Sequence, residues 1–225
     1  MSEGVSMSNS SLGQKYLMAV TGLIGYGFVI GHILGNLLIF AGPDALNSYA
    51  AALRELPFGG LWIARVVLLS AVIGHVVLAI KLAKQNRKAR PSRYAVDASF
   101  QATKASMSML LSGLLILAYI FYHLAHFTWR VVAYAGPYTD ALGRDDVYRM
   151  VVESFQQPVI ALTYIIAMVL VGLHLRHGSH SMFQSLGINH PRYNRLIRLI
   201  PPVIGGVVAF CGLTIPVAVL LGVVG

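Results

Sequence analysis

The chain has 225 residues, of which 56% are hydrophobic and only 11% are charged, and its formal net charge is +9. Charged residues usually make up about a quarter of a soluble domain, so this composition excludes an ordinary water-soluble protein. The positive charge alone would allow a nucleic-acid-binding protein, but its distribution along the chain, given below, argues against one.

Five apolar stretches follow one another along the chain, at about residues 16–40, 61–82, 107–131, 158–180 and 199–224. A helix needs about 20 apolar residues to cross a bilayer, and each stretch reaches or approaches that length. The stretches must be helical, because lipid offers no water to backbone polar groups and five segments of one chain cannot close a barrel. The connecting segments are too short for a second domain. The sequence therefore predicts an all-α membrane protein with a single transmembrane domain, residues 1–225.

Basic residues are concentrated on one side of the predicted spans. The last turns of the second and fourth spans and the loops after them contain almost only basic charges: Lys81, Lys84, Arg87, Lys88, Arg90, Arg93, Lys104, Arg176, Arg192, Arg195 and Arg198. Basic loops usually face the cytoplasm, so we expect the N-terminus inside and the C-terminus outside. The charge is thus explained by topology, with contacts to anionic lipid headgroups as a further use. No nucleic-acid partner is expected.

The first span contains glycines at a regular spacing, in the sequence GFVIGHILG. Gly27, Gly31 and Gly35 recur every four residues and therefore share one helix face. Such a face favours close packing of two helices. It would equally allow a flat cofactor to lie beside His32. The two interpretations are compatible, and the sequence leaves both open.

Five histidines fall within the predicted spans: His32, His75, His123, His126 and His174. Ionisable residues inside a membrane are costly and usually functional. At about 1.5 Å per residue, His32 and His123 lie roughly 24 Å from the inner edge, while His75 and His174 lie about 21–24 Å from the outer edge. The sequence therefore predicts an outer pair, His32 with His123, and an inner pair, His75 with His174.

Two histidines facing each other can hold a haem iron from both sides, which closes the iron to oxygen and suits electron transfer. The chain lacks the CxxCH attachment signature, so the haem would be non-covalent, of the b type. Zinc would need clustered ligands rather than separate layers. A proton-relay transporter would need carboxylates, and none of the eight acidic residues lies within a span. The sequence therefore predicts two haems b, held by four of the five helices.

At these residues the chain resembles the single-chain, five-helix, dihaem cytochrome b subunits of succinate:menaquinone oxidoreductases and fumarate reductases. The resemblance covers nearly the whole chain and rests on TGLIGYGFVIGHILGNLL, VIGHVVLAIKL, YHLAHFTWR and HLRHGSHSMFQSLG. It implies axial ligands at His32, His75 and His174. In the third span it favours His123 over His126 as the ligand.

The resemblance also implies partners. Such subunits lie in the bacterial cytoplasmic membrane, anchor a flavoprotein and an iron–sulphur protein at the cytoplasmic face, and exchange electrons with menaquinone. The N-terminus, residues 84–104 and the loop after His180 would then be docking surfaces. Some family members have an acidic residue just before the fourth-helix ligand. Here those positions are Gly172 and Leu173, so no proton path through a carboxylate follows.

Other polar residues in or near the spans are candidates for contacts to haem propionates or quinone: Asn36, Arg65, His126, Arg130, Arg176, His177 and His180. Five of these seven residues have a simpler alternative. Arg65 would extend its head to the outer interface, Asn36 would bond to another helix, and Arg176, His177 and His180 would face lipid headgroups.

Two other functions remain as alternatives. One is the cytochrome b of a different quinone-linked enzyme, such as a hydrogenase or a formate dehydrogenase. The other is a membrane transporter or assembly protein without a cofactor.

Overall fold

The computed structural model describes residues 10–88 and 109–225. The regular secondary structure of these residues is helical, apart from an isolated bridge between Thr139 and Asp145. The α-helices are α1 (Ser11–Asn36), α2 (Pro43–Arg54), α3 (Gly60–Lys88), α5 (Met109–His123), α6 (Val147–Phe155), α7 (Pro158–Ser185) and α8 (Asn194–Leu220). The shorter turns are η1 (Leu37–Ala41), η2 (Pro57–Gly59) and the π-helical η4 (Leu124–Thr128).

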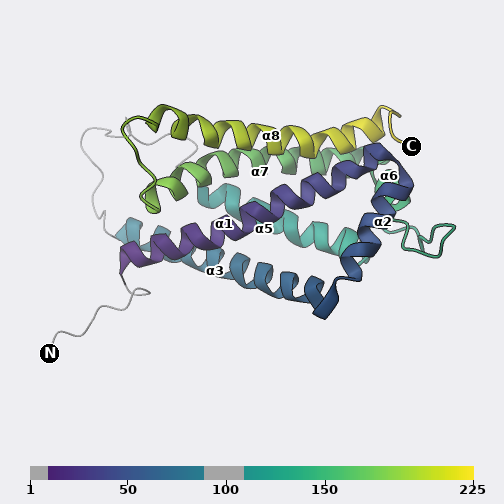
Figure 1. Ribbon diagram of the computed structural model, residues 1–225, viewed down its shortest axis with the longest axis horizontal. Coiled ribbons are helices and arrows are strands. Elements are labelled where there is room, and N and C mark those ends of the chain that lie inside the picture. The colour runs from purple at the N-terminus through teal and green to yellow at the C-terminus, as the bar shows by residue number, and fades with distance from the viewer. Residues whose placement is uncertain (1–9, 89–108) are drawn as a thin grey trace.

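Five helical segments are long and apolar enough to cross a membrane: Ser11–Ala41, Pro57–Lys88, Met109–Thr128, Pro158–Ser185 and Asn194–Leu220. They lie side by side along the longest axis of the molecule (Figure 1). The predicted all-helical fold with five such segments is therefore confirmed for the described residues. This architecture is typical of a multi-pass membrane protein.

Four of the long helices form a ring. Helix α1 packs against α3 and α7, and α5 also packs against α3 and α7. Helix α1 is therefore diagonally opposite α5, and α3 is diagonally opposite α7. Helix α8 lies outside the ring and packs chiefly on α7. The four helices of the ring are the four on which the sequence analysis placed histidine ligands.

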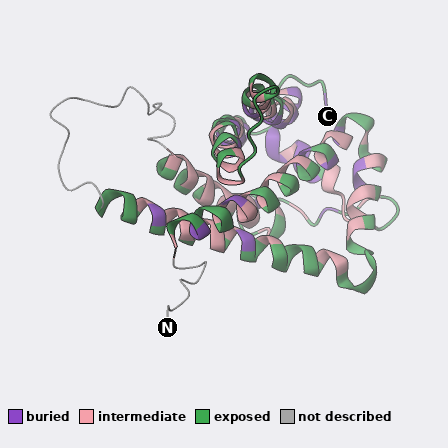
Figure 2. Cartoon of the chain, turned by 60° about the vertical axis from the view of Figure 1, so that its left-hand side comes forward, coloured by how far each residue is buried: buried purple, intermediate pink, exposed green. Residues whose placement is uncertain are grey.

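Burial is uneven across this arrangement (Figure 2). Most buried residues of the long helices belong to α7 and α8, whereas α3 has only Ala71 and Leu82 buried and α5 has none. The seam between α7 and α8 contains glycines that allow close approach. A Cβ atom on Gly205 would lie 2.5 Å from the carbonyl oxygen of Gly172. The backbones of these two helices are thus in direct contact.

The two ends of the bundle differ in charge. The end where α1 begins, here called the basic end, contains Lys15, Lys81, Lys84, Arg87, Lys88, Arg192, Arg195 and Arg198 and no acidic residue within the described ranges. The opposite end, here called the acidic end, contains Asp44, Glu55, Asp140, Asp145, Asp146 and Glu153. The structure thus gathers basic and acidic residues at opposite ends of the bundle. The predicted docking surfaces include residues 1–9 and 89–104, which lie outside the described residues.

Helices α2 and α6 at the acidic end were not predicted from the sequence. Helix α6 buries Val151, Val152 and Phe155 against the acidic-end turns of α7 and α8. Buried Asn47 attaches α2 to the start of α6, because its amide donates to Asp146 (2.9 Å) and its oxygen accepts from the backbone N–H of Tyr148 (2.9 Å). These two helices cover the acidic end of the bundle.

The third span is shorter than predicted at its outer end. Helix α5 continues into the π-helical turn η4, where Trp129 N–H donates to the carbonyl of Leu124 (2.7 Å), five residues back. The chain then leaves the helix, and Arg130 takes a positive φ of 57°. By contrast, Pro158 opens α7 as predicted, since a proline loses nothing at the first position of a helix.

Candidate functional site

The outer histidines lie on diagonally opposite helices and face each other. The rings of His32 on α1 and His123 on α5 have their centres 5.7 Å apart and stand nearly perpendicular, at 88°. Metal–imidazole bonds of about 2 Å on each side of one ion put the ligating nitrogens about 4 Å apart and the ring centres roughly 6 Å apart. The two rings are therefore spaced as a pair that grips one metal ion would be.

The inner histidines lie on the other diagonal, each ring against a neighbouring helix. His75 on α3 has its Nδ1 3.3 Å from the carbonyl oxygen of Met18 and 3.4 Å from Oγ1 of Thr21, both on α1. His174 on α7 has its Nδ1 3.2 Å from Oγ of Ser112 on α5.

The two pairs occupy separate layers. The inner pair is level with Thr21 on α1 and Ser112 on α5. His32 follows Thr21 by eleven residues and His123 follows Ser112 by eleven residues, which is about 16 Å along each helix. Both helices run from the basic end to the acidic end (Figure 1). The structure thus places His32 beside His123, and it places His75 and His174 at one level nearer the basic end.

Space is open beside the outer pair. His32 is exposed although its ring faces another helix, and Phe28 stacks on it at 5.3 Å. A Cβ atom on Gly25, Gly27 or Gly31 would meet nothing within 4 Å. Close helix packing, one of the two interpretations of this glycine row, is therefore absent at Gly27 and Gly31.

Gly35 is the member of that row that does pack closely. A Cβ atom there would lie 2.5 Å from the ring of Tyr49 on α2. Within the row, Gly35 therefore packs against α2, whereas Gly27 and Gly31 pack against nothing in the described protein.

His126 is a structural residue of the interior. It is 1% exposed, its Nδ1 lies 2.9 Å from the hydroxyl of Tyr164, and its Nε2 lies 3.0 Å from the hydroxyl of Ser154. Both ring nitrogens are thus engaged by protein, which leaves none for a metal, a propionate or a quinone. The Nδ1 atom of His123, by contrast, is buried without a partner in the described protein.

No protein-family model, curated protein or solved structure matches the chain.

Within the described residues, no group of three or more His, Cys, Asp or Glu side chains is arranged to hold a metal ion. Each histidine pair would therefore offer a metal ion at most two side-chain ligands. Two protein ligands on opposite sides suit an iron whose four equatorial ligands come from a macrocycle. They do not suit zinc, which takes three or four protein ligands.

Two other candidate contacts have partners inside the protein. The side-chain amide of Asn36 donates to the carbonyl oxygen of His32 (2.7 Å), within the same helix. Arg130 forms an ion pair with Asp145, which also pairs with Arg54 of α2. Partial burial would raise the pKa of Asp145, but the hydrogen bonds from Arg130 and Arg54 outweigh it and hold that pKa below its usual value.

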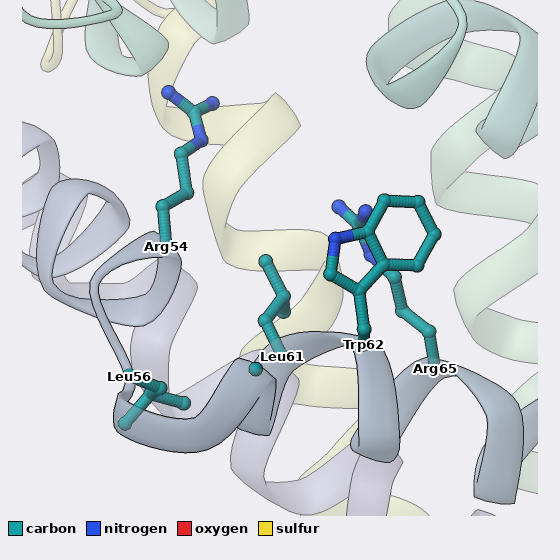
Figure 3. A pocket seen from close by; sticks show the side chains of 6 residues that line it. Arg54, Leu56, Leu61, Trp62 and Arg65 are labelled. Atoms are coloured by element: carbon teal, nitrogen blue, oxygen red, sulfur yellow. The ribbon is translucent and has the colours of Figure 1, made fainter.

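Arg65 differs from the other arginines at the acidic end. Arg54, Arg130, Arg144 and Arg149 each pair with an acidic residue, whereas Arg65 has no acidic partner among the described residues. Its guanidinium lies 4.8 Å from the ring centre of Trp62. Arg65 and Trp62 line a pocket of about 240 Å³ with Arg54, Leu56, Gly59 and Leu61 (Figure 3). Of the predicted propionate candidates at this end, Arg65 has the charge most available to an anion.

The candidates near the basic end lie on the last turns of α7. Arg176 and His180 are exposed, and His180 lies 3.2 Å from the amide nitrogen of Gln184. His177 is partly buried. No contact distinguishes a propionate role from a headgroup role for these three residues. Four residues before Arg176, Gly172 is enclosed by Ala209 and Gly205 of α8, so this packing has no room for a carboxylate at that position.

The sequence analysis did not identify Thr21 and Ser112 as parts of the site. A signal for them exists, because each precedes an outer histidine on the same helix by eleven residues. Eleven residues make about three turns, so the hydroxyl and the histidine share one helix face. The signal lies in the polar residues of the first and third spans that are level with the inner histidines.

Proposed function

We propose that the chain is the membrane subunit of a bacterial succinate:quinone oxidoreductase, a succinate dehydrogenase or fumarate reductase, and that it holds two haems b. The observation that carries the proposal is the arrangement of four histidines as two diagonal pairs, in two layers about 16 Å apart along the helices. Diagonal pairing favours a large, flat ligand, since a haem lies across the middle of a helical ring between its two axial ligands.

The protein's part in haem binding is assigned residue by residue. His32 and His123 would ligate the outer haem, and His75 and His174 the inner one. The haem supplies one-electron transfer when bound, and two histidine ligands keep other ligands from its iron. Arg65 is the candidate for a propionate at the acidic end, because it has no acidic partner among the described residues.

The assignment to this class of enzyme rests on the resemblance of the four ligand segments. In that assignment the basic end faces the cytoplasm and receives the flavoprotein and the iron–sulphur protein, which agrees with the positive-inside rule. Menaquinone would exchange electrons with the membrane subunit. The residues of its site are not assigned.

Absorption spectroscopy of the purified subunit tests haem binding directly. We expect a b-type reduced-minus-oxidised spectrum and two haems per polypeptide. His75→Ala and His174→Ala should each remove the same haem, and His32→Ala and His123→Ala should each remove the other. A control is His190→Ala, because His190 lies in the loop before α8, away from both pairs, and should leave both haems in place.

Two results would overturn the proposal. One is a wild-type subunit that never contains a b-type haem, which would favour a cofactor-free transporter or assembly protein. The other is loss of the outer haem in His126→Ala with its retention in His123→Ala.

Co-purification from the native membrane tests the enzyme class. A flavoprotein and an iron–sulphur protein that together oxidise succinate or reduce fumarate are expected. A nickel- or molybdenum-containing partner would contradict this assignment. It would instead identify the cytochrome b of a hydrogenase or a formate dehydrogenase.

A further inference from the structure

Each inner histidine is contacted by a hydroxyl group from a helix that carries an outer histidine. Thr21 of α1 lies 3.4 Å from Nδ1 of His75, and Ser112 of α5 lies 3.2 Å from Nδ1 of His174. The two contacts are alike: in each, a hydroxyl oxygen lies near Nδ1 of one inner histidine. Helices α1 and α5 therefore each present one residue to the inner layer and one to the outer layer.

The direction of these hydrogen bonds follows from where the hydroxyl protons go. Ser112 donates to the carbonyl oxygen of Met109 (3.0 Å), and Thr21 donates to the carbonyl of Leu17 (2.9 Å) or Met18 (3.1 Å). A hydroxyl has one proton and two lone pairs, so once its proton is given away its oxygen can only accept. The Nδ1–H groups of both inner histidines are therefore the donors.

This direction fixes the tautomer of the inner rings. A neutral imidazole that donates from Nδ1 has its free lone pair on Nε2. The carbonyl oxygen of Met18, 3.3 Å from Nδ1 of His75, is a second acceptor for the same proton. Both inner rings thus offer Nε2 as a metal ligand.

We propose that Thr21 and Ser112 are positioning residues of the inner haem, which orient its two histidine ligands and lower its reduction potential. The inference rests on the proposed dihaem function. An acceptor on Nδ1–H makes the ligating nitrogen more basic, which stabilises ferric over ferrous iron. Axial ligation and hydrogen bonding are the means by which a protein sets haem potential. Such partners are absent from the outer pair in the described protein, where Nδ1 of His123 is buried and unbonded.

Redox titration of the purified subunit tests the proposal. The inner haem is identified as the one missing from His75→Ala. In Thr21→Val and in Ser112→Ala we expect its ferric-to-ferrous equilibrium to shift about three- to tenfold toward ferrous, or about 30–60 mV upward at 59 mV per tenfold. The low-spin ferric signal of the same haem in electron paramagnetic resonance should move as well. The outer haem should keep its potential and its signal.

Two further variants complete the test. Thr214→Val removes a hydroxyl on α8 that bonds only to the carbonyl of Cys211, and it should shift neither haem. Thr21→Ser keeps an acceptor and should retain the wild-type potential. If Thr21→Val loses the inner haem while Thr21→Ser retains it, the positioning role is also supported.

The possible failures are distinct. An unchanged or lowered inner potential in both Thr21→Val and Ser112→Ala overturns the inference and leaves the dihaem function intact. An equal shift in Thr214→Val also overturns it. A wild-type subunit without b-type haem would instead overturn the proposed function.

Discussion

Glycine is used in opposite ways on two sides of the molecule. Between α7 and α8, a Cβ atom on Gly205 would lie 2.5 Å from the carbonyl of Gly172, and one on Gly212 would lie 2.5 Å from the sulfur of Met168. Along α1, a Cβ atom on Gly27 or Gly31 would meet nothing within 4 Å. A row of small residues in a membrane helix therefore does not by itself show where two helices pack.

Helices α7 and α8 thus pack directly against each other, whereas the opposite side of the bundle leaves its surface free for contacts with other molecules. The α7–α8 seam gains its stability from dispersion contacts between close backbones, the main source of helix association in lipid. The sides of α1, α3 and α5 bury few residues. Three of the four histidines assigned as haem ligands are on these three helices. The less packed side of the bundle is thus the one on which we expect a cofactor and lipid to complete the packing.

The largest expected effect comes from filling the seam. Gly205→Ala would press a methyl group against the backbone of α7 and should lower the free energy of unfolding by about 3 kcal/mol. Gly206→Ala is the matched control on the same helix, because a Cβ atom there meets nothing within 4 Å and alanine favours helix by about 1 kcal/mol. Gly31→Ala should behave like this control. Unfolding in mixed detergent micelles measures all three.

The contrast between the two glycine rows would be contradicted if Gly31→Ala lowered the free energy of unfolding as much as Gly205→Ala. In that case α1 would form a close helix contact that the arrangement of the described residues does not contain.

A smaller effect is expected from the buried histidine of the packed side. The ring of His126 links Tyr164 of α7 to Ser154 of α6. His126→Leu leaves the Tyr164 hydroxyl buried without its acceptor and should lower the free energy of unfolding by about 2 kcal/mol. Tyr164→Phe should lower the free energy of unfolding by less than this. The double variant should lower it by less than the sum of the two single effects. Additive losses in this double-mutant cycle would show that the two side chains do not interact.

The smallest effect is expected at the rim of the acidic end, where Asp145 joins Arg54 and Arg130. Asp145→Asn should lower the free energy of unfolding by about 1 kcal/mol at neutral pH and low salt. The folded-state pKa of Asp145 is held below its usual value, so its contribution is full above that usual value. The contribution is then lost as the pH falls through the lowered pKa.

Thermal unfolding of wild type and Asp145→Asn at neutral and strongly acidic pH measures this contribution. The difference between the two proteins should be greatest at neutral pH and should vanish in acid. A difference that grows on acidification would contradict the ion pairs at this rim.

Much of the fold could be predicted because the membrane restricts what an apolar chain can do. The five spans follow from apolar length, and the opening of α7 at Pro158 follows from the chemistry of proline. The levels of His32, His75, His123 and His174 could be derived from the regular rise of a helix, and the resemblance favoured His123 over His126. Whether these four histidines bind haem stays a prediction.

Other features could not be predicted, because they depend on contacts between segments far apart in the chain. Helices α2 and α6 are short and only partly apolar, so their pattern does not stand out from that of loops. The hydroxyls of Thr21 and Ser112 gain their importance from imidazoles that lie 54 and 62 residues away in the sequence.

By itself, the sequence determined which long segments are helical and where each histidine stands along its helix, because hydrophobic length and helical rise are local properties. Only the tertiary structure decided which histidines face each other, which of the two on the third span is committed to the protein interior, and which glycines meet another helix. Each of these depends on the rotation of one helix relative to its neighbours. That rotation is set by the packing of all the side chains together, which no single segment contains.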